Sequence, residues 1–373
     1  MITTTTDVDN SFMQAAIGLA ERGLGRTWPN PSVGCIIVND GRVVGRGWTQ
    51  PGGRPHAETE ALLRAGDDAK GGIAYVTLEP CAHQGETPPC AQSLIDAGIA
   101  RVVIGVEDPD PRVSGGGIEM LRDAGVAVDV GVKAAEVAQV TNGFLKRMVE
   151  SRPHVTLKVA TTLDGRIATK SGDSEWVTSD GARRSGQMLR ANHDAILVGA
   201  RTAAEDNPSL TCRLAGLEDR SPVRIVVDGR MRLPLTHELV TSANKHPTWL
   251  FTFAKTPQNA DRRRAYNGAG VEIFDVTPDP AGNPDLNEIV NLMAEKGLTR
   301  VLVEGGGIIA AAFLKQGLID EVLWYRAAKI VGGDGLPAIA GIGIERLIDA
   351  KRMNRLYVEG IGDDVVERYS LTG

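Results

Sequence analysis

The stretch LEPCAHQGETPPC, residues 78–90, contains two cysteines that lie nine positions apart and each follow a proline directly. The chain has only four cysteines in 373 residues. That number is too small for a disulfide framework, and a close pair in a reducing compartment is typical of a metal-binding or catalytic site. Cys81 and Cys90 are therefore candidate metal ligands. Cys35, inside the apolar run VGCIIV, is predicted to be a buried small hydrophobic residue.

An upstream histidine completes a set of three ligands. His56 precedes the segment AETEALLRAG, whose apolar spacing predicts a helix that ends at Gly66. Two thiolates and one imidazole are the ligands of a catalytic zinc, which keeps a fourth position open for water. Glu58 lies two residues beyond His56, so its carboxylate is expected beside that water, where it can transfer protons. His83 is an alternative fourth ligand, and a closed site with four protein ligands would be structural.

This set matches the zinc deaminase signature, an HxE segment followed by PCxxC, with one departure. Eight residues separate Cys81 from Cys90, whereas the signature has two. The longer loop costs little, because loop-closure entropy grows slowly with length. The sequence therefore predicts a zinc site that supports hydrolytic deamination. The alternative without catalysis is a nucleotide-binding module with a structural zinc.

Strand-like apolar runs alternate with helical patterns along the whole chain, which predicts an α/β protein with two domains. Asn39, Asp40 and Gly41 predict a hairpin, because Asp-Gly favours the tight turn between antiparallel strands. In the first half, strands are expected at 33–38, 43–47, 73–78, 101–106 and 126–130, and helices at 57–65, 91–97, around 118–121 and at 134–149.

The second half repeats this alternation after Pro153. A proline disfavours helix at the preceding residue, and the apolar run HVTLKVA follows at once, so we expect the domains to be 1–150 and 151–373. In the second domain, strands are expected at 154–160, 195–199, 223–228, 248–253, 271–274, 300–306 and 321–328, and helices near 180–191, 287–296 and 308–316.

Charge and composition argue against several classes of protein. The net charge is −6, whereas general nucleic-acid binders usually carry a basic stripe. The amino terminus has no basic patch followed by an apolar run, and no stretch reaches the roughly 18 apolar residues of a membrane span. We therefore expect a cytoplasmic protein whose partners are neither nucleic acids nor membranes. The same balance disfavours the main alternative enzyme, a nucleic-acid or free-nucleoside deaminase.

Several motifs resemble one family. PNPSVGCIIV, HAETEAL, TLEPCAHQGETPPC and DPDP resemble the deaminase half of the bifunctional deaminase-reductases of riboflavin biosynthesis, whose cysteines have the same wide spacing. VTLKVATTLDGRIAT, SGDSEWVTS, LVGARTAAEDNPSLTCR and RVLVEGGG resemble the reductase half, which is similar to dihydrofolate reductase in fold. The resemblance implies an N-terminal cytidine-deaminase-like three-layer α/β/α domain followed by a dihydrofolate-reductase-like α/β domain.

The resemblance also implies the chemistry. The first domain would use one zinc per chain to deaminate a diaminopyrimidinone that carries a phosphoribosylamino group, and the second would reduce the ribosyl chain to ribityl with NADPH. Asn30 would contact the pyrimidine, although a residue between two prolines is also an ordinary turn residue. Thr49 stands where the family often has histidine. A homo-oligomer is expected, with the apolar segment EVLWYRAAKI, residues 321–330, as a candidate interface.

In the reductase half, the resemblance implies two groups of binding residues. The dinucleotide would be bound by Ala160, Trp176, Thr202, Asp206, Gly306, Gly307, Ile308, Ile309, Ala310, Ala311 and Ala312. The substrate would be bound by Ser174, Arg190, Leu210, Arg213 and Glu304. The structural alternatives are that Trp176 is an ordinary core residue and that residues 305–307 form a plain strand-to-helix turn instead of a phosphate cradle.

Two features of this half concern individual side chains. Lys158 lies on the apolar strand VTLKVA, and a buried lysine is costly unless it is paired. We assign Lys158 and Asp206 to the reacting sugar as catalytic residues. Arg183, Gln187 and Arg190 have the spacing of one helical face, which would be either a solvated charged face or a phosphate-binding one.

Overall fold

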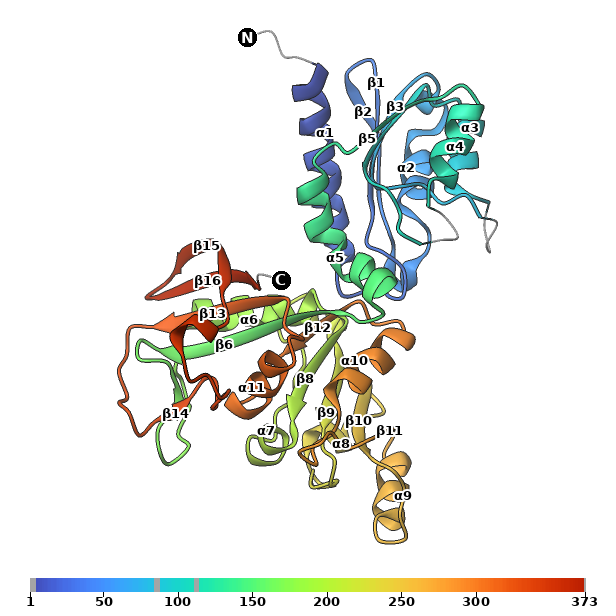
Figure 1. Cartoon of the computed structure of the whole chain (residues 1–373). Helices are drawn as coiled ribbons and strands as arrows, with labels where there is room; N and C mark the ends of the chain where they lie inside the picture. The colour runs from blue at the N-terminus through green and yellow to red at the C-terminus, as the bar shows by residue number, and fades with distance from the viewer. Residues whose placement is uncertain (1–4, 84–87, 111–113, 372–373) are drawn as a thin grey trace. The chain divides into compact units, whose positions relative to one another are not determined.

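The computed structural model describes residues 5–83, 88–110 and 114–371 (Figure 1). The chain divides into two compact units, Met1–Arg152 and Pro153–Gly373, so the division lies two residues from the position expected from the sequence. Each unit has its own sheet, and each is described by itself. Among the described residues, no helix is both long enough and apolar enough to cross a bilayer.

The first unit contains a five-stranded sheet with the order β2-β1-β3-β4-β5. Its strands are β1 (Gly34–Asn39), β2 (Arg42–Trp48), β3 (Ile73–Leu78), β4 (Arg101–Val106) and β5 (Ala127–Val130). β1 pairs antiparallel with β2 and β3, while β3, β4 and β5 run parallel. Asp40 and Gly41 have positive φ angles of 49° and 72°, which a tight hairpin turn requires, so the predicted hairpin is confirmed.

Helices cover both faces of this sheet (Figure 1). α1 (Thr5–Ala20) and α5 (Ala134–Glu150) lie on one face, and α2 (Ala57–Ala65), α3 (Cys90–Asp96) and α4 (Gly116–Asp123) lie on the other. Alternate side chains of a strand point to opposite faces. Ile36 therefore joins the core that contains Met13 of α1, whereas Cys35 joins the core that contains Ala61 of α2. The three-layer α/β/α arrangement and the burial of Cys35 are both as predicted.

The second unit contains a nine-stranded sheet with the order β11-β10-β9-β8-β12-β6-β13-β16-β15. Its strands are β6 (His154–Thr162), β8 (Ala195–Gly199), β9 (Val223–Val227), β10 (Thr248–Phe253), β11 (Glu272–Val276), β12 (Arg300–Val303), β13 (Glu321–Ala327), β15 (Met353–Ile361) and β16 (Asp364–Leu371). From β11 to β13 the strands are parallel, and β16 and β15 continue the sheet antiparallel. β7 (Arg166–Ala168) and β14 (Leu336–Pro337) form a separate pair.

The helices of the second unit are α6 (Asp180–Ala191), α7 (Ala200–Glu205), α8 (Glu238–Thr241), α9 (Ala260–Gly268), α10 (Leu286–Glu295) and α11 (Gly307–Lys315). The 3-10 helices in the described parts of both units are η1 (Glu21–Gly23), η2 (Pro51–Gly53), η3 (Gly66–Ala69), η4 (Glu218–Arg220) and η5 (Leu347–Asp349). The sequence predicts α6, α10 and α11 correctly and misses α7, α8 and α9. It also misses α1 and the carboxyl-terminal strands β15 and β16.

The segment expected to form a subunit interface is largely an inner strand. β13 pairs with β6 on one side and with β16 on the other, so it has no free edge for another chain. Exposed apolar side chains lie instead on the edge strand β15, at Leu356, Tyr357 and Val358.

Candidate active sites

His56, Cys81 and Cys90 come together in the first unit. His56 is the residue before α2, Cys81 follows β3, and Cys90 is the first residue of α3. The three potential ligand atoms all lie within 4.8 Å of one another. The His56 Nδ1 atom lies 3.3 Å from the Cys90 Sγ and 3.8 Å from the Cys81 Sγ. A tetrahedral zinc with bonds of about 2.0 Å to nitrogen and about 2.3 Å to sulfur needs ligand atoms roughly 3.5–3.8 Å apart, so these donors fit one ion.

The described residues supply three ligands to this group. His83, the alternative fourth ligand, is exposed and is not a member of it. Hydrogen bonding by the Cys90 side chain, with a further contribution from His56, lowers the pKa of Cys81 to about 4 even though burial opposes the change. The backbone N–H of Cys90 also donates to the Cys81 Sγ at 3.3 Å. The side-chain hydrogen bond to Cys81 and burial raise the pKa of Cys90, so without a metal the two thiols share a proton, and Cys81 is the one that favours the thiolate form that binds metal.

Glu58 lies in the first turn of α2 and is only 4% exposed. Burial and the negative charge of Cys81 raise its pKa to about 7, although the opposite charge of His56 works against them. The position of α2 is fixed by close packing on β2, because a Cβ on Gly47 would lie 2.0 Å from the carbonyl oxygen of Ala57. The arrangement therefore places a buried carboxyl beside the three ligands.

Asn30 and Thr49 are held by backbone contacts. The Asn30 side-chain amide donates to the Gly53 carbonyl at 3.0 Å, and a Cβ on Gly53 would lie 2.2 Å from the Asn30 amide nitrogen. Thr49 is buried, and its hydroxyl accepts a hydrogen bond from the Val33 N–H at 3.0 Å. The threonine side chain therefore joins the residue before β1 to the residue after β2.

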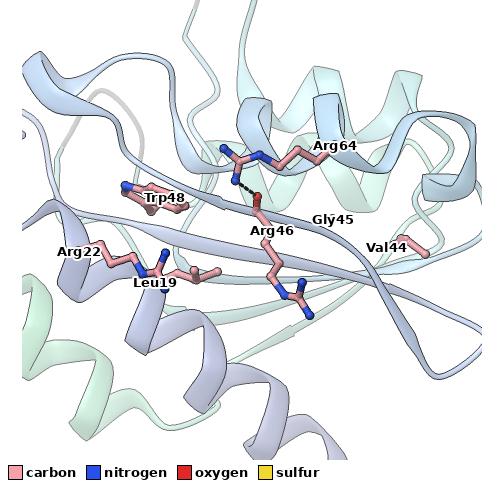
Figure 2. A pocket seen from close by; sticks show the side chains of 7 residues that line it. All are labelled: Leu19, Arg22, Val44, Gly45, Arg46, Trp48 and Arg64. Carbon is pink, nitrogen blue, oxygen red and sulfur yellow. Dashed lines mark hydrogen bonds between the residues drawn. The ribbon is translucent and has the colours of Figure 1, made fainter.

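A separate pocket of about 490 Å³ lies beside β2, and its lining includes Trp48 and three arginines (Figure 2). Arg22 and Arg64 place their guanidinium groups 5.1 Å and 5.2 Å from the Trp48 ring centroid. Arg64 also donates to the Arg46 carbonyl at 2.6 Å and to Glu60 at 2.7 Å. We assign no ligand to this pocket, because the Arg64 guanidinium already has a carboxylate, a carbonyl and an aromatic partner.

In the second unit, the carboxylate of Glu304, just after β12, pairs with two positively charged side chains. Arg190 of α6 binds its carboxylate in a fork, with Nε and Nη2 each 3.0 Å from one oxygen. The Lys158 Nζ atom lies 3.6 Å from the same carboxylate. Burial alone would raise the pKa of Glu304, but the charges of Arg190 and Lys158 outweigh it and lower the pKa to about 2. Lys158 thus has the partner that a lysine on an apolar strand requires.

The helical face that carries Arg190 is not a solvated charged face. Arg183 stacks on Trp176, with 4.1 Å between its guanidinium carbon and the ring, and donates to the Thr178 carbonyl at 2.9 Å. Gln187 accepts a hydrogen bond from the Arg213 N–H at 2.8 Å. The fork of Arg190 is occupied by Glu304, so its guanidinium is already matched to a carboxylate.

Comparisons with known proteins identify a family for each half of the chain. The cytidine and deoxycytidylate deaminase zinc-binding region matches residues 6–106, and the RibD C-terminal domain matches residues 153–366. The riboflavin biosynthesis protein RibD of Escherichia coli K12 is 40% identical over 368 residues, which cover 96% of this chain and 98% of that protein. The chain belongs to the RibD family.

Solved RibD-family structures share the whole architecture. RibD from Acinetobacter baumannii superposes with a TM-score of 0.87 at 36% identity, covering 99% of this chain and all of the other. A diaminohydroxyphosphoribosylaminopyrimidine deaminase/5-amino-6-(5-phosphoribosylamino)uracil reductase from Thermotoga maritima superposes with a TM-score of 0.86 at 35% identity. The expected combination is therefore confirmed, with a cytidine-deaminase-like domain followed by a dihydrofolate-reductase-like RibD domain in a bifunctional deaminase-reductase of riboflavin biosynthesis.

The expected dinucleotide residues of this RibD chain include the turn between β12 and α11. The Gly306 N–H donates to the Thr202 hydroxyl at 3.2 Å. A Cβ on Gly305 would lie 2.0 Å from the Ile309 side chain, and one on Gly307 would lie 2.6 Å from the Pro337 carbonyl oxygen. Packing therefore explains these two glycines without a phosphate. Ala310 and Ala311 are buried and Ile308 is 63% exposed, so the α11 residues do not present a single face to a ligand.

The remaining candidates differ in exposure. Trp176 is 60% exposed, so it is not the core residue of the structural alternative. Asp206 ends α7 and is exposed, as are Ser174 and Arg213. Leu210 is buried with a positive φ of 54°. Ala160 pairs in register with Tyr325 of β13. In the part of the chain that the structure describes, no hydrogen bond joins Asp206 to the Lys158–Glu304–Arg190 group.

Sequence reasoning missed two buried polar groups near these sites. The Tyr325 hydroxyl lies 2.7 Å from the Ser185 hydroxyl, and the Lys158 Nζ lies 6.0 Å from the Tyr325 ring centroid. Glu79, two residues before Cys81, is buried with its carboxylate hydrogen-bonded to backbone N–H groups. An acid at the end of an apolar strand was the available signal for Glu79. Tyr325 lies in an apolar strand and carries no such signal.

Proposed function

We propose that this RibD chain first deaminates a phosphoribosylamino-substituted diaminopyrimidinone and then reduces the ribosyl chain of the product to ribityl with NADPH. The observation that carries the proposal is the presence of two separate constellations in one chain. His56, Cys81 and Cys90 with Glu58 belong to the first unit, whereas the Lys158–Glu304–Arg190 group belongs to the second. We also propose that the chain works in the cytoplasm on this small-molecule substrate.

In the deamination, the oxygen of a water molecule replaces the ring amino group, and the amino group leaves as ammonia. A zinc held by His56, Cys81 and Cys90 would supply the Lewis acidity that makes water nucleophilic near neutral pH. Glu58 takes a proton from the attacking water, delivers it to the ring nitrogen, and then protonates the departing amino group. Glu58 is buried beside the ligand group, so its carboxyl is shielded from bulk water and placed to transfer protons in both directions. Asn30 is proposed to contact the pyrimidine.

In the reduction, a hydride and a proton are added to the sugar. NADPH would supply the hydride to the anomeric carbon of the ribosyl chain. Lys158, fixed by Glu304, and Asp206 are the residues that we assign to proton movement at the sugar. Arg190, Ser174, Leu210, Arg213 and Glu304 are proposed to surround the substrate. The dinucleotide is proposed to lie along Ala160, Trp176, Thr202, Asp206 and residues 306–312.

The direct test uses the zinc-loaded protein and the phosphoribosylamino pyrimidine, with and without NADPH, and identifies the products by mass. Without NADPH, we expect one amino group to be replaced by a carbonyl oxygen and ammonia to be released. With NADPH, we expect the same product to gain two hydrogens. Substrate that stays unchanged in both reactions would exclude this function for the chain.

Removal of zinc is expected to separate the two activities. Because the zinc ligands lie in the first unit, chelation should stop ammonia release while the reduction of already deaminated substrate continues. Both rates should be measured on one sample, with circular dichroism to show that it stays folded, since loss of a zinc can also unfold a domain. A folded, zinc-free protein that has lost both activities would contradict the division.

Substitution of either cysteine is expected to lower the zinc content. Cys81→Ser and Cys90→Ser each remove a thiolate, and a serine hydroxyl is a poor replacement because the soft thiolate is the preferred ligand. Zinc per chain should be measured by elemental analysis. Cys212→Ser is the matched control, because Cys212 is buried in the second unit and belongs to no ligand group among the described residues. Unchanged zinc in Cys81→Ser or Cys90→Ser would remove that residue from the ligand set.

We also propose a homo-oligomer that forms through β15. This edge strand exposes Leu356, Tyr357 and Val358. Replacing both Leu356 and Val358 by glutamate is expected to reduce the mass measured by light scattering to that of one chain, because charge repels across the contact. Glu359→Gln on the same strand is the control. A double variant with the mass of the unmodified protein would rule out this surface.

A further inference from the structure

Glu79 is a buried carboxylate between β3 and the candidate ligand Cys81. It is 3% exposed, and its Oε1 atom accepts hydrogen bonds from the N–H groups of Gly117 at 2.9 Å and Ile118 at 3.2 Å. Its Oε2 atom accepts from the N–H groups of Gly115 at 3.1 Å and Asp108 at 3.2 Å. An ionised carboxylate has about four lone-pair sites, so these four bonds fill them.

Three of the four donors belong to the start of α4. The first N–H groups of a helix have no partner within it, and the helix dipole favours a negative charge at that end. Glu79 therefore satisfies the amino terminus of α4 from a different strand of the sheet. The fourth donor, Asp108, lies just beyond β4, and the Glu79 N–H donates to the Val106 carbonyl at 3.0 Å. One side chain thus joins the ends of β3, β4 and α4.

A second contact fixes the residue between Glu79 and Cys81. A Cβ on the buried Gly117 would lie 1.9 Å from the Pro80 carbonyl oxygen, so the first turn of α4 packs directly on Pro80. On the other side of the ligand, the Ala91 N–H of α3 donates to the Cys81 carbonyl at 3.2 Å. The segment that carries Cys81 therefore packs against α4 at Pro80 and is hydrogen-bonded to α3 at Cys81.

We propose that Glu79 and Gly117 are positioning residues of the metal centre, which hold Cys81 at the distance that lets its thiolate share an ion with His56 and Cys90. The inference rests on the zinc site of the proposed function. Neither residue contacts the ligand atoms in the described structure, so both act through Pro80 and the backbone of Cys81. Glutamine at position 79 would turn a nitrogen with two hydrogens toward two N–H donors, and alanine at position 117 would displace Pro80.

The test measures zinc affinity by competition with a chelator, and the visible spectrum after replacement of zinc by cobalt(II). Glu79→Gln and Gly117→Ala are each expected to bind zinc about 10–100-fold more weakly, the range found when supporting residues of metal ligands are changed. Their cobalt spectra should differ from that of the unmodified chain. Glu119→Gln is the matched control, because Glu119 is an exposed acid on the same helix, and its affinity and spectrum should be unchanged.

Three results separate this inference from the function on which it rests. If the unmodified chain binds no zinc, the proposed metal site itself is wrong. If it binds zinc and both variants match the Glu119→Gln control in affinity and spectrum, the positioning role is wrong. If circular dichroism shows that both variants unfold the first unit, the two residues serve folding, and the positioning role is again overturned. If only one of the two variants folds, its zinc affinity decides whether the positioning role holds.

Discussion

Replacing Glu58 by glutamine is expected to slow deamination by about 10²–10⁴-fold while the chain keeps its zinc. The three ligands stay in place, because Glu58 does not belong to the ligand group. Glutamine has nearly the same shape but cannot carry a proton between the water, the ring nitrogen and the departing ammonia. The loss should therefore appear in turnover and leave the metal content unchanged.

The measurement combines the rate of ammonia release with zinc analysis of the same preparation. Glu60→Gln is the matched control, because Glu60 lies on the same helix and pairs with Arg64 beside the pocket at Trp48. That variant should deaminate at a rate close to that of the unmodified chain. Near-normal turnover in a zinc-loaded Glu58→Gln protein would exclude Glu58 as the proton carrier.

Replacing Glu304 by glutamine is expected to abolish most of the reduction and to spare deamination. Arg190 and Lys158 would both lose their carboxylate, and removing one partner of a buried ion pair destabilises a protein by about 3–5 kcal/mol. The Arg190 side chain is 13% exposed, so little water is available to replace the carboxylate. The two cations would move away from the proposed position of the sugar, and a displacement of about 1 Å can cost about 10²-fold in rate.

Both rates should be followed on one preparation, and circular dichroism should show that the second unit stays folded, because deamination in the first unit does not report on it. Glu272→Gln is the matched control, because Glu272 forms an exposed pair with Lys296, and exposed pairs contribute little to stability. It should keep both activities. A Glu304→Gln protein that reduces the substrate at the normal rate would show that the Lys158–Glu304–Arg190 group is dispensable for this reaction.

The sequence predicts the parts of the molecule whose residues carry a local signal. Asp40 and Gly41 mark a turn by their chemistry, and the continuous apolar runs of β1 and β3 mark strands buried on both faces. The group of candidate zinc ligands was predictable because their residue types are rare and their arrangement is typical of one reaction. Lys158 was predictable as a paired residue because an unpaired ammonium group on an apolar strand would be costly to bury.

Other features depend on partners that are distant in sequence. Glu79 binds backbone N–H groups 29 to 39 residues further along the chain, and backbone donors leave no trace in residue type. Arg190 has a carboxylate partner 114 residues away. Its helical spacing alone could therefore not exclude a solvated charged face. β15 was missed because nearly all its side chains are exposed, which removes the alternation that identifies a half-buried strand.

The order of strands in the second sheet has a consequence for synthesis on the ribosome. β6 is made first, yet its neighbours in the sheet are β12, which begins at Arg300, and β13, which begins at Glu321. The sheet of the first unit, in contrast, is complete once β5 ends at Val130. Domains generally fold as units from the amino terminus while the chain is made. The first unit is thus expected to fold during translation. The apolar β6, in contrast, stays unpaired until the chain is nearly finished, and during that time it can pair with other chains and aggregate.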